Sequence, residues 1–302
     1  MTPREIIAEA WAITRREKAL RRWGFTSTFL ETLLSLKLLL YQTYFAYEFF
    51  YVGEKAGFFD IEFRLYDQIP HALFWTFIGL FVLLVLIELV VPSFCTGVLI
   101  GLAAKSYRKE PVRGGMVLGL YNFAPMLVIH EMFLLGSLTN VVTCISVVVR
   151  YIDDPLRIPT IWMIFVFYLT SNFLQFFANF APEAVVIRKM SVFDAVGKSF
   201  KLIVSYLSHV MFLILLLFVI SLRILMNAAM VLVVPGVTIG VGLLLATFLP
   251  LAVSYSIAGV VAMALIVLAS YFFSYIHVFK QTVWTIAYLE LSDRKDLDVI
   301  IT

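Results

Sequence analysis

Four charged residues stand inside long apolar stretches of the sequence, where a membrane could surround them. They are Lys37, Glu88, Glu131 and Arg223, two cations and two anions. A charge at mid-depth in a bilayer costs about 2.5 to 3.5 kcal/mol on insertion scales, so such residues pair with each other or line a hydrated pathway. Lys37 and Glu88 lie at similar depths in neighbouring stretches, and we therefore expect them to form an ion pair.

Uncharged polar side chains in the same stretches extend this candidate set. They are His130, which precedes Glu131, Asn227, which follows Arg223 by one turn, and a stripe at i, i+3 and i+7 formed by Asn172, Gln175 and Asn179. One interpretation is a hydrated pathway or a pocket for an acidic headgroup, lined by the two Glu, Arg223 and the amide stripe. The other is that these groups form buried pairs and hydrogen bonds between helices, each worth about 1 kcal/mol.

The signatures of known catalytic sites are missing from the sequence. His130 and Glu131 begin like the zinc-binding HExxH motif, but Leu134 occupies the place of the second His. Neither GxSxG nor GxxxxGK[ST] occurs, and the four His are scattered over different segments. Every Asp lies in an expected loop, surface helix or tail. We therefore expect no enzyme activity, no catalytic or metal-binding residues and no cofactor.

The composition indicates which elements must position these residues. Of 302 residues, 62% are hydrophobic and 14% charged, whereas about a quarter of a soluble domain is charged. The net charge of +3 is too small to favour nucleic acid as a partner. Cys95 and Cys144 lie far apart in apolar segments, which is typical of buried cysteines and not of a disulfide framework.

The apolar stretches predict a single all-α integral membrane domain over residues 1–302. About 20 apolar residues cross the hydrocarbon, which gives six expected transmembrane helices, at 26–52, 70–104, 122–148, 158–187, 206–234 and 254–289. Residues 235–250 are apolar, rich in Gly and short, and we expect a re-entrant or interfacial segment there. A seventh span at that place would move the C-terminus to the other side.

The distribution of Lys and Arg predicts the orientation. With six spans and the N-terminus inside, sixteen of these residues fall on the cytoplasmic side, and four fall on the other side, namely Lys55, Arg64, Arg150 and Arg157. The first 25 residues are charged and amphipathic without an apolar h-region, so a cleavable signal peptide is not expected. We predict a plasma (inner) membrane location in a prokaryote, with both termini in the cytoplasm.

An amphipathic run, SVFDAVGKSFKLIVSYL at 191–207, precedes the fifth expected span. As a helix it places Phe193, Val196 and Phe200 on one side with Ile203 and Leu207, and Asp194, Lys198 and Lys201 on the other with Ser205. Ser191 is the expected N-cap, with Asp194 three residues later. Lys198 and Lys201 could each gain about 1 kcal/mol from anionic lipid, which favours a lipid-facing or helix-supporting surface helix over an active site.

Similar helix-start signals precede the first and third expected spans. Thr2, Pro3 and Glu5 form a helix start, and Pro111 opens a run with Val112, Met116 and Leu120 in register. This pattern predicts a threefold repeat of surface helix, outward span and inward span, over 1–104, 105–190 and 191–302. The alternative is that any six-span protein has amphipathic loops.

Residues 182–199, PEAVVIRKMSVFDAVGKS, have a Pro at the membrane exit, a Ser at the cap, Ala four residues later and Ser after four more. In this run and in its layout the chain resembles a family of uncharacterised six-span prokaryotic membrane proteins. Those proteins are similar in turn to the membrane domain attached to some bacterial glycerophosphodiester phosphodiesterases. In the fused proteins a separate soluble barrel performs catalysis, and this chain has no room for one. The resemblance therefore implies architecture and no catalytic residue.

These observations favour a non-enzymatic scaffold or accessory subunit that binds membrane lipids and other membrane protein subunits. A small transporter or carrier with a polar intramembrane site is the alternative. An integral membrane enzyme acting on lipids comes third.

Overall fold

The computed structural model describes residues 1–53, 57, 59–66, 70–133, 136–232 and 234–294. Helices account for 89% of the structure, and the described residues contain no strand. The helices are α1 (Pro3–Arg16), α2 (Lys18–Tyr47), which continues as a π-helical turn (Glu48–Val52), α3 (Asp60–Tyr66), α4 (His71–Tyr107), α5 (Gly115–Met132), α6 (Leu138–Tyr151), α7 (Asp154–Phe177), α8 (Ala181–Arg188), α9 (Val192–Ser205), α10 (Leu207–Leu232), α11 (Val234–Ala246) and α12 (Leu251–Arg294). The predicted all-α class is confirmed.

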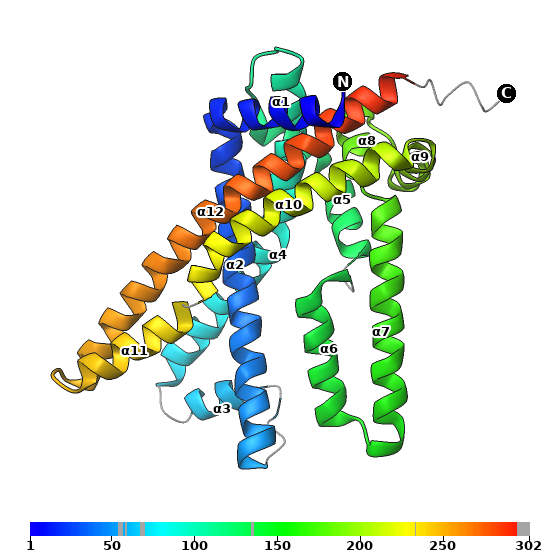
Figure 1. The fold of residues 1–302 in the computed structure, drawn as a ribbon. Helices are drawn as coiled ribbons and strands as arrows, with labels where there is room; N and C mark the ends of the chain where they lie inside the picture. Colours follow the sequence, from blue (N-terminus) through cyan, green and yellow to red (C-terminus); the bar gives the residue numbers. More distant parts are fainter. Residues whose placement is uncertain (54–56, 58, 67–69, 134–135, 233, 295–302) are drawn as a thin grey trace.

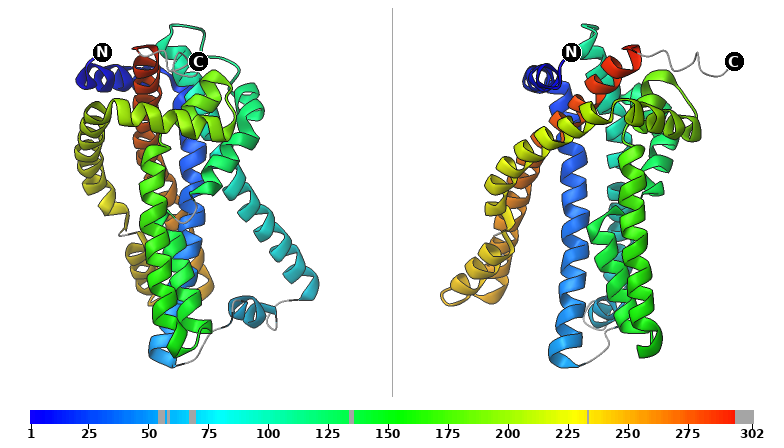
Figure 2. Two further views of the ribbon diagram at one scale, coloured as in Figure 1. Left: turned by 90° about the vertical axis from the view of Figure 1, so that its right-hand side faces the viewer. Right: turned by 45° about the vertical axis from the view of Figure 1, so that its right-hand side comes forward.

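The helices run between two ends of the molecule, and we name the end at which α1, α8 and α9 lie the head end (Figure 1). From the head end α2 leads to the far end, where α3 lies, and α4 returns (Figure 1). α5 and α6 lead away again and α7 returns, and α10 with α11 leads away before α12 returns (Figure 2). Helix α2 packs against both α4 and α12, so it lies at the centre of the bundle.

Candidate membrane spans are fewer in the described residues than the sequence predicts. Three helices are long and apolar enough to cross a bilayer, namely His71–Tyr107, Pro155–Phe177 and Ser256–Arg294. Helices α9 and α10 meet at 93°, and that pair would supply a fourth. Two differences from the prediction have local reasons. Glu31 and Lys37 interrupt the apolar stretch of α2, and the predicted span 122–148 is divided between α5 and the short α6.

Two other predicted segments have different bounds in the structure. The span expected at 158–187 stops at Phe177, and the chain turns there into α8 at the head end. Helix α11 occupies most of 235–250, where a re-entrant or interfacial segment was predicted. Helix α11 packs against α12, as α10 does, and therefore continues the path of α10 toward the far end.

The buried core lies at the head end. It is formed by α1, the end of α4, α8, α9, the start of α10 and the end of α12, with Ile6, Leu99, Phe180, Leu202 and Tyr288 among its fully enclosed members. Toward the far end the helices separate and large apolar side chains become exposed on their outer surfaces (Figure 2). Exposed apolar area on this scale marks contact with lipid or another protein.

The predicted start of α1 is confirmed. The Thr2 hydroxyl accepts from the Glu5 backbone N–H at 3.4 Å, and the Glu5 carboxylate accepts from the Thr2 N–H at 2.8 Å. These two bonds satisfy donors that a helix N-terminus leaves open. Ile6, Ala10 and Ile13 then form the buried face of the helix.

Helix α9 also begins as predicted, but it buries a different face. Ser191 caps the helix by accepting from the Asp194 N–H at 3.4 Å. Lys198, which was expected on the polar side of a surface helix, is only 9% exposed, whereas Phe193 is 81% exposed. The face that packs inward contains small and branched residues that fit closely against α8, and Lys198 lies among them: Ala195, Lys198, Ser199, Leu202 and Ile203. Val196 is half-buried, and Phe200 and Lys201 are exposed.

The middle surface helix of the expected repeat does not form. Residues 111–114 are non-helical, and α5 begins directly at Gly115, so Met116 and Leu120 lie on α5 itself. Gly114 adopts a left-handed conformation with φ of 78°, which glycine accommodates without strain. The first and third units have a surface helix before their first long helix, and the second unit lacks one.

Candidate functional site

Lys37 of α2 and Glu88 of α4 form the predicted ion pair. The Lys37 Nζ lies 2.7 Å from each of the two Glu88 carboxylate oxygens. The Glu88 side chain is fully buried and that of Lys37 is 21% exposed. Lys37 Nζ also lies 5.3 Å from the centre of the Phe81 ring, which adds a cation–π contact. The pair therefore joins two long neighbouring helices. Each charged group offsets the free-energy cost of burying the other in apolar surroundings.

A second polar group, which we call the far-end cluster, links the outer end of α2 to α3. The hydroxyl of Tyr41 donates to Glu62, and that of Tyr44 donates to Asp60 at 2.8 Å. Arg64 lies 3.4 Å from a carboxylate oxygen of Glu48 and 3.3 Å from one of Asp60. This cluster was not predicted from the sequence, although Tyr41, Tyr44 and Glu48 stand at i, i+3 and i+7.

Arg150 at the end of α6 packs beside this cluster. Its side chain is buried, its guanidinium carbon lies 3.7 Å from the centre of the Phe45 ring, and its Nε donates to the Ser146 carbonyl at 3.2 Å. Gln42 of α2 donates to Thr143 of α6 at 3.3 Å. These contacts tie α6 to α2 near the far end.

His130 and Glu131 lie at the end of α5 and do not join the Lys37 pair. The His130 Nδ1 is 3.4 Å from a Glu131 carboxylate oxygen, and both side chains are exposed. No group of three or more His, Cys, Asp or Glu that could hold a metal is present among the described residues.

The amide stripe of α7 faces the turn between α5 and α6. Asn172 Nδ2 donates to the Gly136 carbonyl at 3.2 Å and to the Tyr168 carbonyl at 2.9 Å. Gln175 also lies against this turn, because a Cβ added to Gly136 would be 3.0 Å from its Oε1. Asn179 does not continue the stripe as predicted, because α7 ends at Phe177 and Asn179 lies in the turn before α8; its Nδ2 is buried without a hydrogen-bond partner in the described part of the chain. The contacts of the stripe are those expected of hydrogen bonds that position helices.

Arg223 and Asn227 belong to α10, which is helical at both positions. The side chains of residues 221–232 lie outside the described part of the structure. The structure therefore gives the positions of these two residues along α10, and their predicted role in a polar site stays a prediction.

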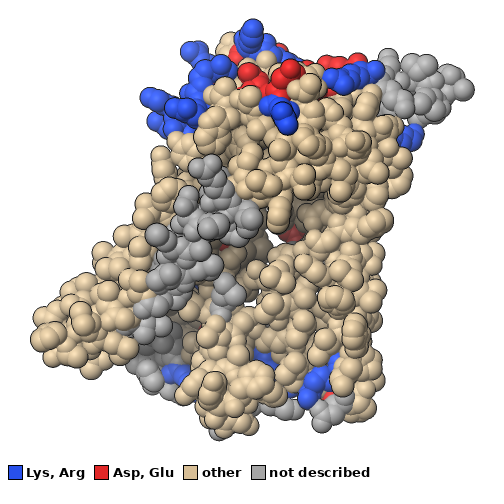
Figure 3. All heavy atoms as spheres, in the orientation of Figure 1, with Lys and Arg blue, Asp and Glu red and all other residues tan. Residues whose placement is uncertain are grey.

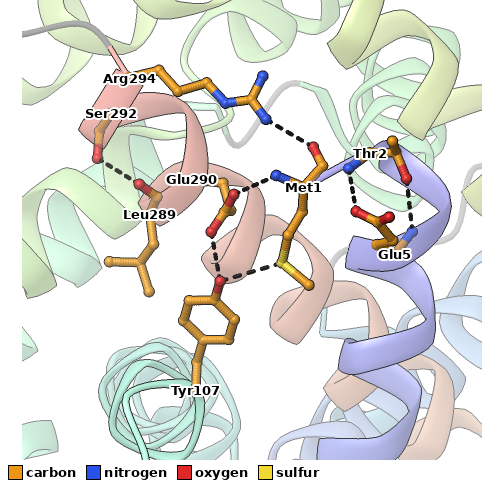
Figure 4. A network of polar contacts seen from close by, with 8 residues as sticks. All are labelled: Met1, Thr2, Glu5, Tyr107, Leu289, Glu290, Ser292 and Arg294. Atoms are coloured by element: carbon orange, nitrogen blue, oxygen red, sulfur yellow. Dashed lines mark hydrogen bonds and ion pairs between the residues drawn. The ribbon is translucent and has the colours of Figure 1, made fainter.

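The head end contains a polar network that no sequence pattern indicated (Figure 4). The Met1 amino group lies 2.7 Å from a Glu290 carboxylate oxygen, and the Tyr107 hydroxyl donates to the other oxygen at 2.6 Å. Arg294 donates to the Met1 carbonyl at 3.0 Å. Both oxygens of the Glu290 carboxylate are thereby bound. The start of the chain, α4 and α12 are thereby joined.

A buried carboxyl lies nearby on α8. Glu183 accepts from the side-chain amide of Gln281 at 2.8 Å, and no partner for its second oxygen occurs among the described residues. Burial raises the pKa of Glu183 to about 8, because desolvation disfavours the ionised form. This carboxyl is largely protonated near neutral pH.

Comparison with protein-family models, with curated proteins and with solved structures gave no match for this chain.

The polar candidates thus divide into separate groups along the bundle. Lys37 and Glu88 neutralise each other, the amide stripe binds a turn, and His130 with Glu131 lies on the surface. The predicted pocket lined by Glu88, Glu131, Arg223 and the stripe would need these groups to converge. Glu88 instead has both oxygens bound to Lys37.

Proposed function

We propose that this protein is a multi-pass membrane protein that acts as a non-enzymatic scaffold or accessory subunit, binding lipid and a partner membrane protein. The observation that carries this proposal is the surface of α7. No residue from Pro155 to Phe177 is buried. Large side chains of this helix, such as Trp162, Phe165 and Phe173, are exposed. Helix α7 packs against the short α6 and against α9, and it lies at the edge of the bundle (Figure 2).

We further propose that the passages between the two ends are six membrane crossings, with α5 plus α6 and α10 plus α11 each forming one of them. Lys and Arg gather at the head end, and the middle of the molecule presents mainly other residue types (Figure 3). Arg64, Arg150 and Arg157 belong to elements at the far end. This asymmetry supports a cytoplasmic head end, since positive residues concentrate on that side of a plasma membrane. The resemblance to six-span prokaryotic membrane proteins agrees with this arrangement.

A carrier is the second candidate function, and the Lys37–Glu88 pair is the observation that favours it. A carrier could exchange this internal pairing for a charged substrate. The two proposals differ in what they require of Lys37 and Glu88. A carrier requires that the two side chains can separate, whereas a scaffold requires only that their charges neutralise each other.

Photo-crosslinking in native membranes tests the scaffold proposal. A photoreactive residue at Phe165 or Phe173 of α7 should give one recurrent protein adduct, and mild detergent should release the same protein in a fixed ratio. The matched control is Leu83, which is exposed on α4 and should give lipid adducts. Lipid adducts alone from α7, together with a monomer in mild detergent, would reject the scaffold.

A further inference from the structure

A hollow of about 450 Å³ lies between the start of α2 and α12. It is lined by Lys18, Arg21, Arg22, Phe25, Thr26, Tyr271, Ser274 and Tyr275, and we call it the α2–α12 hollow. Three of these residues are cations, three are aromatic, and none is acidic. From this lining we propose that the α2–α12 hollow binds the phosphate of an anionic phospholipid headgroup. The proposal rests on the proposed membrane location and names a ligand for the lipid-binding part of that function.

The cations of the hollow differ from those of the ion pairs described above. Lys37 and Arg64 each lie within 3.4 Å of a carboxylate oxygen. The lining of the hollow supplies no carboxylate, so the positive charge there is not neutralised locally. A phosphodiester is the complementary group, because guanidinium groups bind phosphate oxygens through charge-assisted hydrogen bonds.

Arg21 is held in place for such a contact. One of its terminal nitrogens donates to the Tyr275 hydroxyl at 2.6 Å, and its guanidinium carbon lies 5.7 Å from the centre of the Tyr275 ring. The Arg21 Nε–H is shielded from water and has no hydrogen-bond partner in the described part of the structure. Because this nitrogen is shielded, an anion in the hollow would contact the guanidinium of Arg21 through its terminal nitrogens. Orientation by Tyr275 also lowers the entropy lost when an anion binds.

The position of the hollow favours a lipid over a soluble phosphate. Tyr271 is exposed on α12, and Tyr side chains concentrate at the headgroup level of membranes. One turn from Tyr271 along α12 toward the far end, the apolar side chain of Leu268 is exposed, and Phe272 is exposed beside Tyr271. Phe25 stacks on Phe29 at 5.8 Å along α2. A molecule with an anionic head in the hollow would therefore find an apolar surface for its acyl chains.

Native mass spectrometry of the full-length protein, released from mixed vesicles of phosphatidylcholine and phosphatidylglycerol, tests the proposal. We expect retained phosphatidylglycerol, with affinity reduced about 30-fold in the Arg21→Gln/Arg22→Gln variant, since each surface cation contributes about 1 kcal/mol toward anionic lipid. Arg22→Gln alone leaves the Tyr275 contact intact and should weaken binding about fivefold. The matched control is Arg4→Gln/Arg108→Gln, which removes two exposed head-end cations outside the hollow and should change affinity less than twofold.

Three results would overturn the proposal. Equal loss in the control variant would assign the effect to overall charge. Equal retention of phosphatidylcholine would exclude selection of an anionic headgroup, and displacement of phosphatidylglycerol by inorganic phosphate at equal concentration would indicate a soluble phosphate ligand. Carbonate extraction of membranes separately tests the membrane location. A protein that resists extraction and shows no preference for phosphatidylglycerol would refute only the α2–α12 hollow as a lipid site.

Discussion

The ammonium of Lys37 lies 2.7 Å from each carboxylate oxygen of Glu88, and this bidentate pair joins α2 to α4. Removing one partner leaves the other charge buried and unpaired, which costs about 3 kcal/mol or more. We therefore expect Lys37→Met and Glu88→Gln each to destabilise the protein more than the double variant Lys37→Met/Glu88→Leu does. Thermal unfolding in detergent measures all three. Equal losses in the single and double variants would show that the pair does not act as a unit.

Ser199 connects α9 to the end of α7. Its hydroxyl donates to the Phe177 carbonyl at 2.6 Å and accepts from the Phe180 N–H at 3.0 Å. Ser199→Ala leaves both backbone groups without this partner, and we expect a loss of about 1 to 3 kcal/mol. Ser208→Ala, at an exposed position of α10, is the control and should stay within about 0.5 kcal/mol of the parent. Matched stability in the two variants would contradict the role given to Ser199.

Features that depend on short sequence signals were predictable. The caps at Thr2 and Ser191 follow from residues three positions apart, and a helix N-terminus needs such acceptors wherever it lies. The Lys37–Glu88 pair was predicted from the similar positions of the two residues along neighbouring apolar segments, because two buried charges of opposite sign have few other partners.

Features that depend on how distant segments pack were not predictable. The burial of Lys198 depends on which face of α9 meets α8. Small residues such as Ala195 and Ser199, which lie on that face, are not strongly hydrophobic, so the sequence pattern did not identify it as the buried face. The contact between Glu183 and Gln281 joins residues 98 positions apart. Neither position carries a local signal that identifies its partner.

Gly24 allows α2 to approach α12 closely. A Cβ at this position would lie 2.1 Å from Cγ2 of Val278, so Gly24→Ala forces the two helices apart. We expect a loss of about 1 to 3 kcal/mol from overpacking, with partial recovery in Gly24→Ala/Val278→Ala. Gly197→Ala on α9 meets no atom within 4 Å and should stabilise the helix by up to about 1 kcal/mol. Similar thermal shifts for Gly24→Ala and Gly197→Ala would refute the close approach.

The raised pKa of Glu183 makes stability depend on pH. Its pKa rises from an ordinary 4.5 to about 8 in the folded protein, so above pH 4.5 the unfolded chain binds fewer protons than the folded one. The contribution of Glu183 to stability is therefore fully present below pH 4.5 and is lost as the pH rises to about 8. Glu183→Gln can still accept from Gln281 and should be more stable than the parent at pH 8, with a flatter profile. Denaturation measured from pH 5 to 8 tests this, and parallel profiles would disprove it.

The six-crossing arrangement places Arg108 and Asp153 on opposite sides of the membrane. Arg108 follows α4 at the head end, and Asp153 precedes α7 at the far end; both side chains are exposed. In a background with Cys95→Ala and Cys144→Ala, we expect a membrane-impermeant thiol reagent to label Asp153→Cys in intact cells. Arg108→Cys should react only after the membrane is opened, because the cations of the head end hold it in the cytoplasm. Labelling of both cysteines in intact cells would mean that α5 plus α6 does not form a crossing, and the proposed topology would then have to be replaced.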